Sequence, residues 1–213
     1  MEHLPVKVIR KTLEAQDIAS FELARADGAP LPAFSAGSHI DVQVPGGLTR
    51  QYSLCNDAAE QHRYRIAVLR DPASRGGSVA MHDSVHEGDV ITISTPRNHF
   101  ALHPAQRTLL LAGGIGVTPL LCMAQRLAAI NADFTLHYCT RSAERTAFRA
   151  EIAASSFADR VRFHYDAGPP EQKLDLEAAL GLPAPGTRLY VCGPTGFIDH
   201  VVGTAKADRK SVV

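Results

Sequence analysis

The 213-residue chain lacks tryptophan and carries no net charge, because 22 basic side chains balance 22 acidic ones. A balanced chain lacks the basic surface by which proteins usually bind nucleic acid or an anionic membrane, so we expect neither as a partner. It lacks an apolar run of the roughly 20 residues that cross a bilayer. Its start, MEHLPVKVIR, also lacks the basic and then apolar segments of a secretory signal. We therefore expect a cytoplasmic protein, and we take it to be a monomer.

Closely spaced cysteines are also missing. The four cysteines, Cys55, Cys122, Cys139 and Cys192, form no Cys-x-x-Cys pair, which excludes the common zinc and iron–sulfur spacings. Two disulfides are possible in principle, but a reducing cytosol favours free thiols.

Two histidine pairs have the spacing of metal ligands on a helix. They are His82/His86 and His99/His103, and Pro96 argues against a helix that begins before the second pair. No carboxylate cluster accompanies either pair, so we expect solvated or core histidines and no metal site. No serine lies in a Gly-x-Ser-x-Gly sequence, which argues against an acyl-transfer enzyme.

The first half of the chain alternates apolar and polar residues in short runs separated by turns such as PGGL and EGD. We expect strands over residues 6–10, 18–25, 39–44, 50–54, 64–70 and 89–94. Many short strands with regular turns are typical of an antiparallel β-barrel or sandwich. There is room for one short helix between Ser78 and His86.

From residue 108 the pattern changes to strands that alternate with helices. We expect strands at 108–112, 134–139, 161–166 and 188–192, and helices after 119, over 146–155 and 174–180, and from about 195. This alternation is typical of an α/β domain with a parallel sheet covered on both faces. We place the boundary near HPAQ, which gives domains over 1–103 and 104–213.

The segment LLLAGGIGVTPLL is the best candidate for a phosphate-binding turn between a strand and a helix. Gly113, Gly114 and Gly116 let a ligand approach the backbone, and we expect Thr118 to cap the helix with Pro119 as its first residue. The free N–H groups of a helix start favour a pyrophosphate. The segment departs from Gly-x-Gly-x-x-Gly and lacks the Walker lysine, which argues against an ATPase. The alternative is a turn that only reverses the chain.

Two further strand ends reach the same edge of the expected sheet, where open α/β sheets bind ligands. YVCGPTGFI places Cys192, Gly193 and Pro194 there, and HYCTRS places Arg141. Alternatively, Cys192 is a buried structural cysteine and Arg141 an exposed arginine without a partner.

The segment RQYSL, at residues 50–54, combines a cation, an aromatic ring and a hydroxyl. A sheet needs none of these for packing, whereas a planar ligand that carries a phosphate could use all three.

Taken together, Arg-x-Tyr-Ser-Leu, Gly-Gly-Ile-Gly-Val-Thr-Pro and Cys-Gly-Pro, in this order and spacing, resemble the ferredoxin–NADP reductase superfamily. RQYSLCND, RGGSVAMHD and PRNHFAL resemble its phthalate dioxygenase reductase and vanillate demethylase reductase branch. The resemblance runs from about residue 5 to about residue 205. It implies a Greek-key, flavin-binding antiparallel β-barrel followed by an α/β domain with a parallel sheet that binds the nicotinamide nucleotide.

In the barrel, the resemblance implies that Arg50 reaches the flavin phosphate, Tyr52 packs on the isoalloxazine ring and Ser53 lies near flavin N5. Strand geometry puts Arg50 and Tyr52 on one face, so the strand must bend or end at Ser53. FMN is the implied flavin, with FAD as the less favoured alternative. Leu69 stands where related sequences often carry lysine, so one polar flavin contact is expected to be missing. The other implied flavin contacts are Gln51, Ala67, Val68, Arg75, Gly76, Gly77 and Ser78.

In the second domain, the resemblance implies a pyrophosphate held at the glycine turn and a nicotinamide near Cys192. NADH is the expected donor, with NADPH as the alternative. Ser53 and Cys192 are the implied catalytic residues. The implied nucleotide contacts are Gly114, Gly116, Thr118, Pro119, Arg141, Cys192, Gly193 and Pro194.

The implied reaction passes a hydride from NADH to FMN and then single electrons to an iron–sulfur protein. This branch normally continues into a [2Fe–2S] domain, whose Cys-x4-Cys-x2-Cys spacing is absent from the chain. We therefore expect no cluster here, and a ferredoxin or separate [2Fe–2S] domain and a terminal oxygenase as partners. The alternatives are a stand-alone NAD(P)H:flavin reductase and a truncated, non-catalytic nucleotide-binding module.

Overall fold

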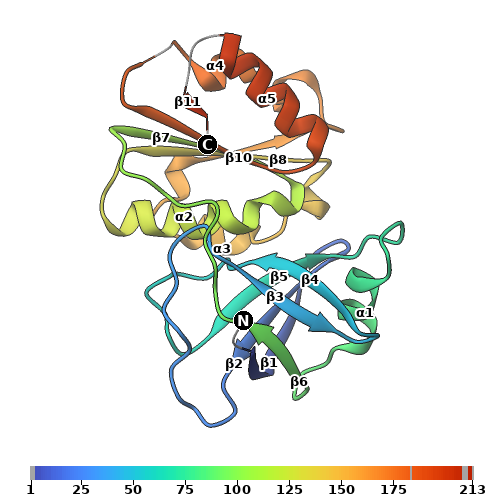
Figure 1. The fold of residues 1–213 in the computed structure, drawn as a ribbon. Coiled ribbons are helices and arrows are strands. Elements are labelled where there is room, and N and C mark those ends of the chain that lie inside the picture. The colour runs from blue at the N-terminus through green and yellow to red at the C-terminus, as the bar shows by residue number, and fades with distance from the viewer. Residues whose placement is uncertain (1–2, 183, 208–210, 213) are drawn as a thin grey trace. The chain divides into compact units, whose positions relative to one another are not determined.

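The protein is described by a computed structural model that covers residues 3–182, 184–207 and 211–212. The chain divides into two compact units, Met1–Leu102 and His103–Val213 (Figure 1). Each unit is built around its own sheet, so each is described by itself.

The first unit is a six-stranded antiparallel sheet in the order β4-β3-β6-β1-β2-β5. Its two edge strands, β4 and β5, lie beside one another but do not pair within the described chain. The sheet therefore curls into a barrel with one open side, called here the β4–β5 seam. The antiparallel fold expected from the sequence is confirmed. The elements are β1 (His3–Ala15), β2 (Ile18–Ala24), β3 (His39–Val44), β4 (Leu48–Ser53), β5 (Tyr64–Leu69), α1 (Gly77–Ser84) and β6 (Val90–Ser94).

The barrel core follows from the alternation along the strands. In β1, Leu4, Val6 and Val8 are buried while their sequence neighbours are exposed. Phe21 and Tyr64, from β2 and β5, are fully buried in the same cluster. Each such side chain contributes about 1.5–3 kcal/mol by leaving water, which fixes the strands that frame the seam.

Lys11 of β1 binds the C-terminal end of helix α1 and so holds the helix against the barrel. The Lys11 ammonium donates to the carbonyl oxygens of His82 and Val85, at 2.5 and 2.7 Å. A cation at this end of a helix satisfies its last carbonyls and complements its dipole. The imidazole Nε2 of His82 lies 2.8 Å from the Val68 carbonyl oxygen, which joins α1 to β5.

The second unit is a five-stranded parallel sheet in the order β11-β10-β7-β8-β9. Helix α2 covers one face, and α4 and α5 cover the other (Figure 1). Leu109 and Leu189 from the sheet share one buried cluster with Leu180 and Val201 from α4 and α5. The expected α/β fold is confirmed. The elements are β7 (Arg107–Gly113), α2 (Val117–Ala129), β8 (Phe134–Thr140), α3 (Arg149–Ala154), β9 (Val161–Tyr165), α4 (Leu176–Leu180), β10 (Thr187–Cys192), α5 (Thr195–Ala207) and β11 (Ser211–Val212).

Two details of the second unit differ from the sequence prediction. The helix expected over 146–155 begins only at Arg149, because a separate 3₁₀ turn occupies Ala143–Arg145 and Thr146 ends that turn. The sheet also gains a short strand, β11, which pairs with the start of β10.

Candidate functional site

Residues of the RQYSL segment take the faces that strand geometry predicts. In β4, Arg50 lies opposite Val42 and Tyr52 opposite Ile40, so both side chains point to the same face. Gln51 points the other way and is exposed. The strand ends at Ser53, as the proposed position of its hydroxyl requires.

Tyr52 is half-buried against the barrel core. Burial raises the pKa of Tyr52 to about 12, although the positive charge of Arg50 opposes the shift. The phenol therefore stays neutral at physiological pH and presents an uncharged aromatic ring beside the seam.

Arg50 packs directly over Gly77, the first residue of α1. A Cβ on Gly77 would lie 2.6 Å from Nε and 2.8 Å from Cγ of Arg50, so only glycine leaves room for this side chain. The contact brings together the Arg-Gln-Tyr-Ser and Arg-Gly-Gly-Ser segments, which are more than twenty residues apart in the sequence.

The Arg50 guanidinium is incompletely satisfied. Its Nη1 donates to the Thr49 carbonyl oxygen at 2.8 Å, but Nη2 is buried and has no hydrogen-bond partner within the described part of the chain. A buried charged donor without a partner is costly, and an anion would satisfy it. The start of α1 adds to this, because Gly76 has a φ of 85° and no side chain caps the helix. The residues present therefore fit a phosphate group.

The loop before α1 is organised by its own hydroxyl groups. Ser78 Oγ accepts from the Asp71 N–H at 3.1 Å and lies 2.9 Å from Ser74 Oγ. Its hydroxyl thus helps to shape the loop, while Arg75 is exposed just before the two glycines. Arg75 lies in the loop that leads to Gly77, and Ser78 is the second residue of α1.

The other side of the seam is β5. Ala67 and Val68 are both buried, but Val68 belongs to the barrel core. Successive strand residues face opposite ways, so Ala67 points away from that core. Leu69 follows it, half-buried, at the end of the strand.

In the second unit, the glycine turn and the Cys-Gly-Pro turn meet at one edge of the sheet. Ala112 pairs with Cys192, and Gly113 pairs with Cys139, so β7, β8 and β10 end at the same level. The turns that follow these strands therefore share the edge at which parallel sheets bind ligands.

Glycine is required at several positions of this edge, for different physical reasons. A Cβ on Gly116 would lie 2.3 Å from the Cys192 carbonyl oxygen, and one on Gly193 would lie 2.9 Å from Gly113 Cα. These glycines let two stretches of backbone touch. Gly114 has a φ of +55° and open space around its Cβ position, so it is the glycine whose backbone a ligand can approach closely.

The expected roles of Thr118 and Pro119 at the helix start are wrong. Residues Gly114–Gly116 form a 3₁₀ turn that continues directly into α2 at Val117. Thr118 is therefore the second helical residue, and its hydroxyl donates to the Ile115 carbonyl oxygen at 3.0 Å instead of capping. Pro119 is buried at the third helical position, where a missing N–H is still tolerated.

Cys192 is a free, half-buried thiol at the end of β10. Burial raises its pKa, although a hydrogen bond with the Gly193 backbone opposes the shift. The thiol is therefore protonated near neutral pH.

Two rings contact the glycine turn at this edge. Pro194 was predicted as a site residue, whereas Phe197 of α5 was not predicted from the sequence. A Cβ on Gly113 would lie 2.9 Å from Phe197 Cδ1 and 3.1 Å from Pro194 Cδ, so both rings press on the glycine turn.

A pair of buried threonines holds the loop that carries Arg141. Thr140 Oγ1 lies 2.8 Å from Thr146 Oγ1, and both hydroxyls donate to the Ser142 carbonyl oxygen. The Ala167 N–H donates to the Arg141 carbonyl oxygen at 3.0 Å. Arg141 is thus exposed on a fixed loop at the ligand edge.

Neither a metal cluster nor a membrane span is found in the part of the chain that the structure describes. No three histidine, cysteine or acidic side chains gather there closely enough to hold a metal ion. Among the described helices, none has the length and apolar character needed to cross a bilayer.

Comparisons with known proteins support the resemblance seen in the motifs. Vanillate O-demethylase oxidoreductase of Pseudomonas sp. strain HR199 is 57% identical over 195 residues, which cover 91% of this chain and 62% of that protein. Phthalate dioxygenase reductase of Burkholderia cepacia is 44% identical over 200 residues, which cover 93% of this chain and 62% of that protein. No family profile matches the chain.

A solved structure shows the same fold. The chain matches phthalate dioxygenase reductase with a TM-score of 0.91 and 43% sequence identity, over 96% of this chain and 64% of that one. That structure is described as a modular one for electron transfer from pyridine nucleotides to [2Fe–2S]. The chain therefore spans somewhat less than two thirds of the length of these relatives.

Proposed function

Because the chain belongs to the ferredoxin reductase-like family that includes phthalate dioxygenase reductase and vanillate O-demethylase oxidoreductase, we propose that it is the flavin- and nicotinamide-binding part of an oxygenase or demethylase reductase. It takes a hydride from NADH onto FMN and passes single electrons to an iron–sulfur partner. The bound flavin supplies the conversion between two-electron and one-electron chemistry, and the protein binds and orients it.

The observation that carries this proposal is the unsatisfied Arg50 Nη2 beside Gly77 and the uncapped start of α1. In the proposal, Arg50 and the Gly76–Gly77 backbone hold the FMN phosphate. Tyr52 offers its ring to the isoalloxazine, and Ser53, at the end of the strand, donates to the ring edge. The other proposed contacts are Gln51, Ala67, Val68, Arg75 and Ser78, of which Gln51 and Val68 would contribute backbone only, because their side chains point away from this face.

The second unit holds NADH in the same proposal. Gly114 and the backbone N–H groups at the start of α2 bind the pyrophosphate. Gly116, Thr118 and Pro119 maintain the conformation of the turn. Cys192, Gly193 and Pro194 form the nicotinamide end, where the neutral thiol leaves the ring uncharged surroundings. Arg141 reaches the adenosine phosphate or ribose from its fixed loop. Ser53 and Cys192 are the proposed catalytic residues, since Ser53 is the proposed contact to the flavin ring in the first unit and Cys192 the proposed contact to the nicotinamide in the second.

The electron acceptor is a [2Fe–2S] protein or domain that works with a terminal oxygenase. This part of the proposal rests on the relatives: one is named a vanillate O-demethylase oxidoreductase and another a phthalate 4,5-dioxygenase reductase subunit. The similar solved structure is described as transferring electrons from pyridine nucleotides to [2Fe–2S]. The domains proposed are a flavin-binding barrel over 1–103 and a nucleotide-binding domain over 104–213, in a cytoplasmic monomer.

The experiment is an anaerobic visible spectrum of the FMN-loaded chain, recorded before and after NADH is added. We expect the flavin absorbance to bleach within seconds and to return when a [2Fe–2S] ferredoxin is supplied. A flavin that is bound but stays oxidised with both NADH and NADPH would contradict the proposed reaction.

A stand-alone NAD(P)H:flavin reductase is the second candidate, because it would need the same two sites. The two functions differ in flavin retention. A reductase component keeps FMN through dialysis and reduces the ferredoxin directly. A flavin reductase loses FMN on dialysis and reduces the ferredoxin only when free flavin is present.

A further inference from the structure

The chain beyond Ser53 crosses the end of the β4–β5 seam. The Leu54 N–H donates to the Ser38 carbonyl oxygen at 2.9 Å, next to β3. One residue later, the Cys55 N–H donates to the Arg65 carbonyl oxygen, also at 2.9 Å, and thereby joins β5. The seam is thus closed at one end by this crossing and bounded at the other by the contact of Arg50 with Gly77.

Asn56 holds this crossing in place. Its side chain is buried, with 1% of the residue exposed, and both the amide oxygen and the amide nitrogen form hydrogen bonds. Its Oδ1 accepts from the Arg65 backbone N–H at 2.8 Å. Its Nδ2 lies within donating distance of Glu60 Oε2, the Arg63 carbonyl oxygen and the Asp57 carbonyl oxygen, at 3.1, 3.2 and 3.2 Å. One buried side chain therefore joins both ends of the loop that connects β4 to β5.

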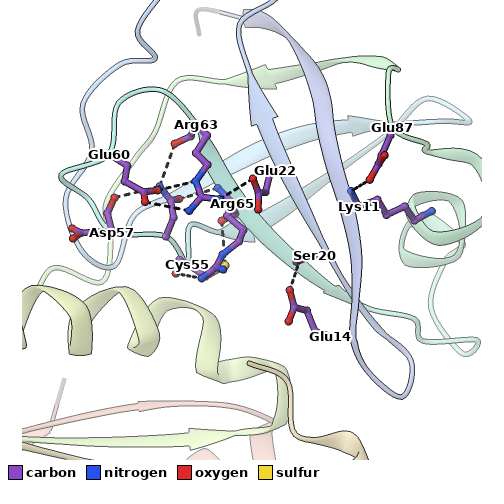
Figure 2. Close-up of polar contacts among 11 residues, drawn as sticks. Lys11, Glu14, Ser20, Glu22, Cys55, Asp57, Glu60, Arg63, Arg65 and Glu87 are labelled. Carbon is purple, nitrogen blue, oxygen red and sulfur yellow. Dashed lines mark hydrogen bonds and ion pairs between the residues drawn. The ribbon is translucent and has the colours of Figure 1, made fainter. Parts of the chain in front are cut away.

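Asn56 is supported by an ionic brace of Glu60, Arg63 and Glu22, whose three side chains are labelled in Figure 2. Arg63 donates from Nε and Nη2 to the two carboxylate oxygens of Glu60, at 3.0 and 3.1 Å. Its Nη1 lies 2.8 Å from Glu22 Oε2 on β2, the strand next to β5. Burial acts to raise the pKa of Glu60, but hydrogen bonds from Arg63 and Asn56 lower it overall. Glu60 is therefore ionised at neutral pH and keeps Asn56 oriented.

We propose that Asn56 is a positioning residue for the flavin, which sets the separation of β4 and β5 at the ring end of the seam. Ser53 lies three residues before Asn56, and Ala67 lies two residues after Arg65, so both are within roughly 10 Å of chain from the amide. The inference rests on the proposed function, because Ser53 and Ala67 are its contacts to the flavin ring. The bonds of Asn56 go to its own loop and to β5, and none of those given above reaches the phosphate end at Arg50 and Gly77.

The test is an FMN titration of the wild-type chain and of Asn56→Ala, followed by visible circular dichroism with FMN saturating. Asn56→Ala removes all of the amide bonds while leaving the phosphate end intact. We expect the Kd for FMN to rise at least tenfold and the dichroism of the bound flavin to change, because the ring is held differently. The signal at saturation reports ring geometry and is independent of how stable the empty chain is.

Asp57→Ala is the matched control in the same loop. Within the described chain, the Asp57 carboxylate accepts from the Ala59 N–H in its own loop, at 2.9 Å, and the backbone contacts of Asp57 remain in the variant. We expect wild-type FMN affinity and dichroism. If Asn56→Ala fails to fold, Asn56→Asp replaces it, since this variant keeps the acceptor for Arg65 but loses the donors. We expect it to show the same change in dichroism.

An Asn56 variant that binds FMN with wild-type affinity and dichroism overturns the inference and leaves the proposed function standing. A wild-type chain that binds no FMN overturns the proposed function, and the inference with it.

Discussion

The two candidate sites are prepared for their ligands in opposite ways. In the barrel, the Arg50 side chain is charged, and its buried Nη2 lacks a hydrogen-bond partner within the described chain. Gly77 makes room for this side chain. In the parallel-sheet unit, backbone packs on backbone, since Gly116 lies against the Cys192 carbonyl. Glycines of two similar motifs therefore have two different roles. At Gly77 it makes room for a binding side chain, and at Gly116 it holds two turns together.

The largest expected effect comes from adding a methyl group at Gly116, where the turn packs on the Cys192 backbone. A Cβ on Gly116 would overlap the Cys192 backbone, which has no alternative rotamer. We expect Gly116→Ala to destabilise the second unit by about 3 kcal/mol and to abolish NADH binding. Urea unfolding monitors the first effect and NADH titration the second.

Gly114→Ala is the control for this substitution. Its Cβ would meet open space, and only the positive φ of +55° opposes it. We expect a loss of about 1 kcal/mol. Equal losses for the two variants would show that backbone packing does not distinguish these glycines.

Acidification sharpens the comparison, because the second unit contains a buried histidine, His137, in contact with a half-buried one, His164. His137 Nδ1 lies 3.0 Å from His164 Nε2. Burial, with help from the positive charges of His164, Arg162 and Arg107, lowers the pKa of His137 from 6.5 to about 4. Between these values the unfolded chain binds a proton that the folded chain does not. Stability is therefore full above pH 6.5 and is lost as the pH falls toward 4, by about 3 kcal/mol.

This pH dependence is measured by urea unfolding of the second unit's signal at pH 7 and pH 4.5. We expect His137→Gln to reduce the difference between the two pH values. A variant that loses as much stability on acidification as the wild type would exclude His137 as its source.

The smallest expected effect on stability is on the barrel side. In Gly77→Ala the new methyl group meets the Arg50 side chain, which can move, and not backbone. We expect stability close to that of the wild type, but FMN affinity reduced about tenfold, or about 1.4 kcal/mol, because the guanidinium is displaced. Fluorescence titration with FMN measures this. A large loss of stability with unchanged affinity would reverse the assignment of Gly77.

Much of the fold and part of the site follow from local sequence. Period-two alternation predicted both the barrel strands and the shared face of Arg50 and Tyr52, since side-chain direction in a strand is a local property. The contact of Arg50 with Gly77 could not be predicted from spacing, because it depends on how the loop before α1 folds back.

The helix start in the second unit shows where local rules fail. Thr118 and Pro119 have the residue types of a cap and a first turn. The Gly-Ile-Gly segment nevertheless continues the helix backwards as a 3₁₀ turn, which moves the start to Val117. Asn56 was missed for a related reason. An asparagine followed by aspartate indicates a turn, and only the tertiary structure shows that its amide joins both ends of the loop.

The most direct test of the central claim, that Arg50 and the start of α1 bind a flavin phosphate, is to compare the Kd for FMN with the Kd for riboflavin in the wild type and in Arg50→Ala. Riboflavin has the same ring system without the phosphate. We expect the wild type to prefer FMN strongly. Arg50→Ala should weaken FMN binding by about 1.5–3 kcal/mol, the range for a charge-assisted hydrogen bond, and leave riboflavin binding unchanged. Equal affinities of the wild type for FMN and riboflavin, or an Arg50→Ala variant that still prefers FMN as strongly, would contradict the account.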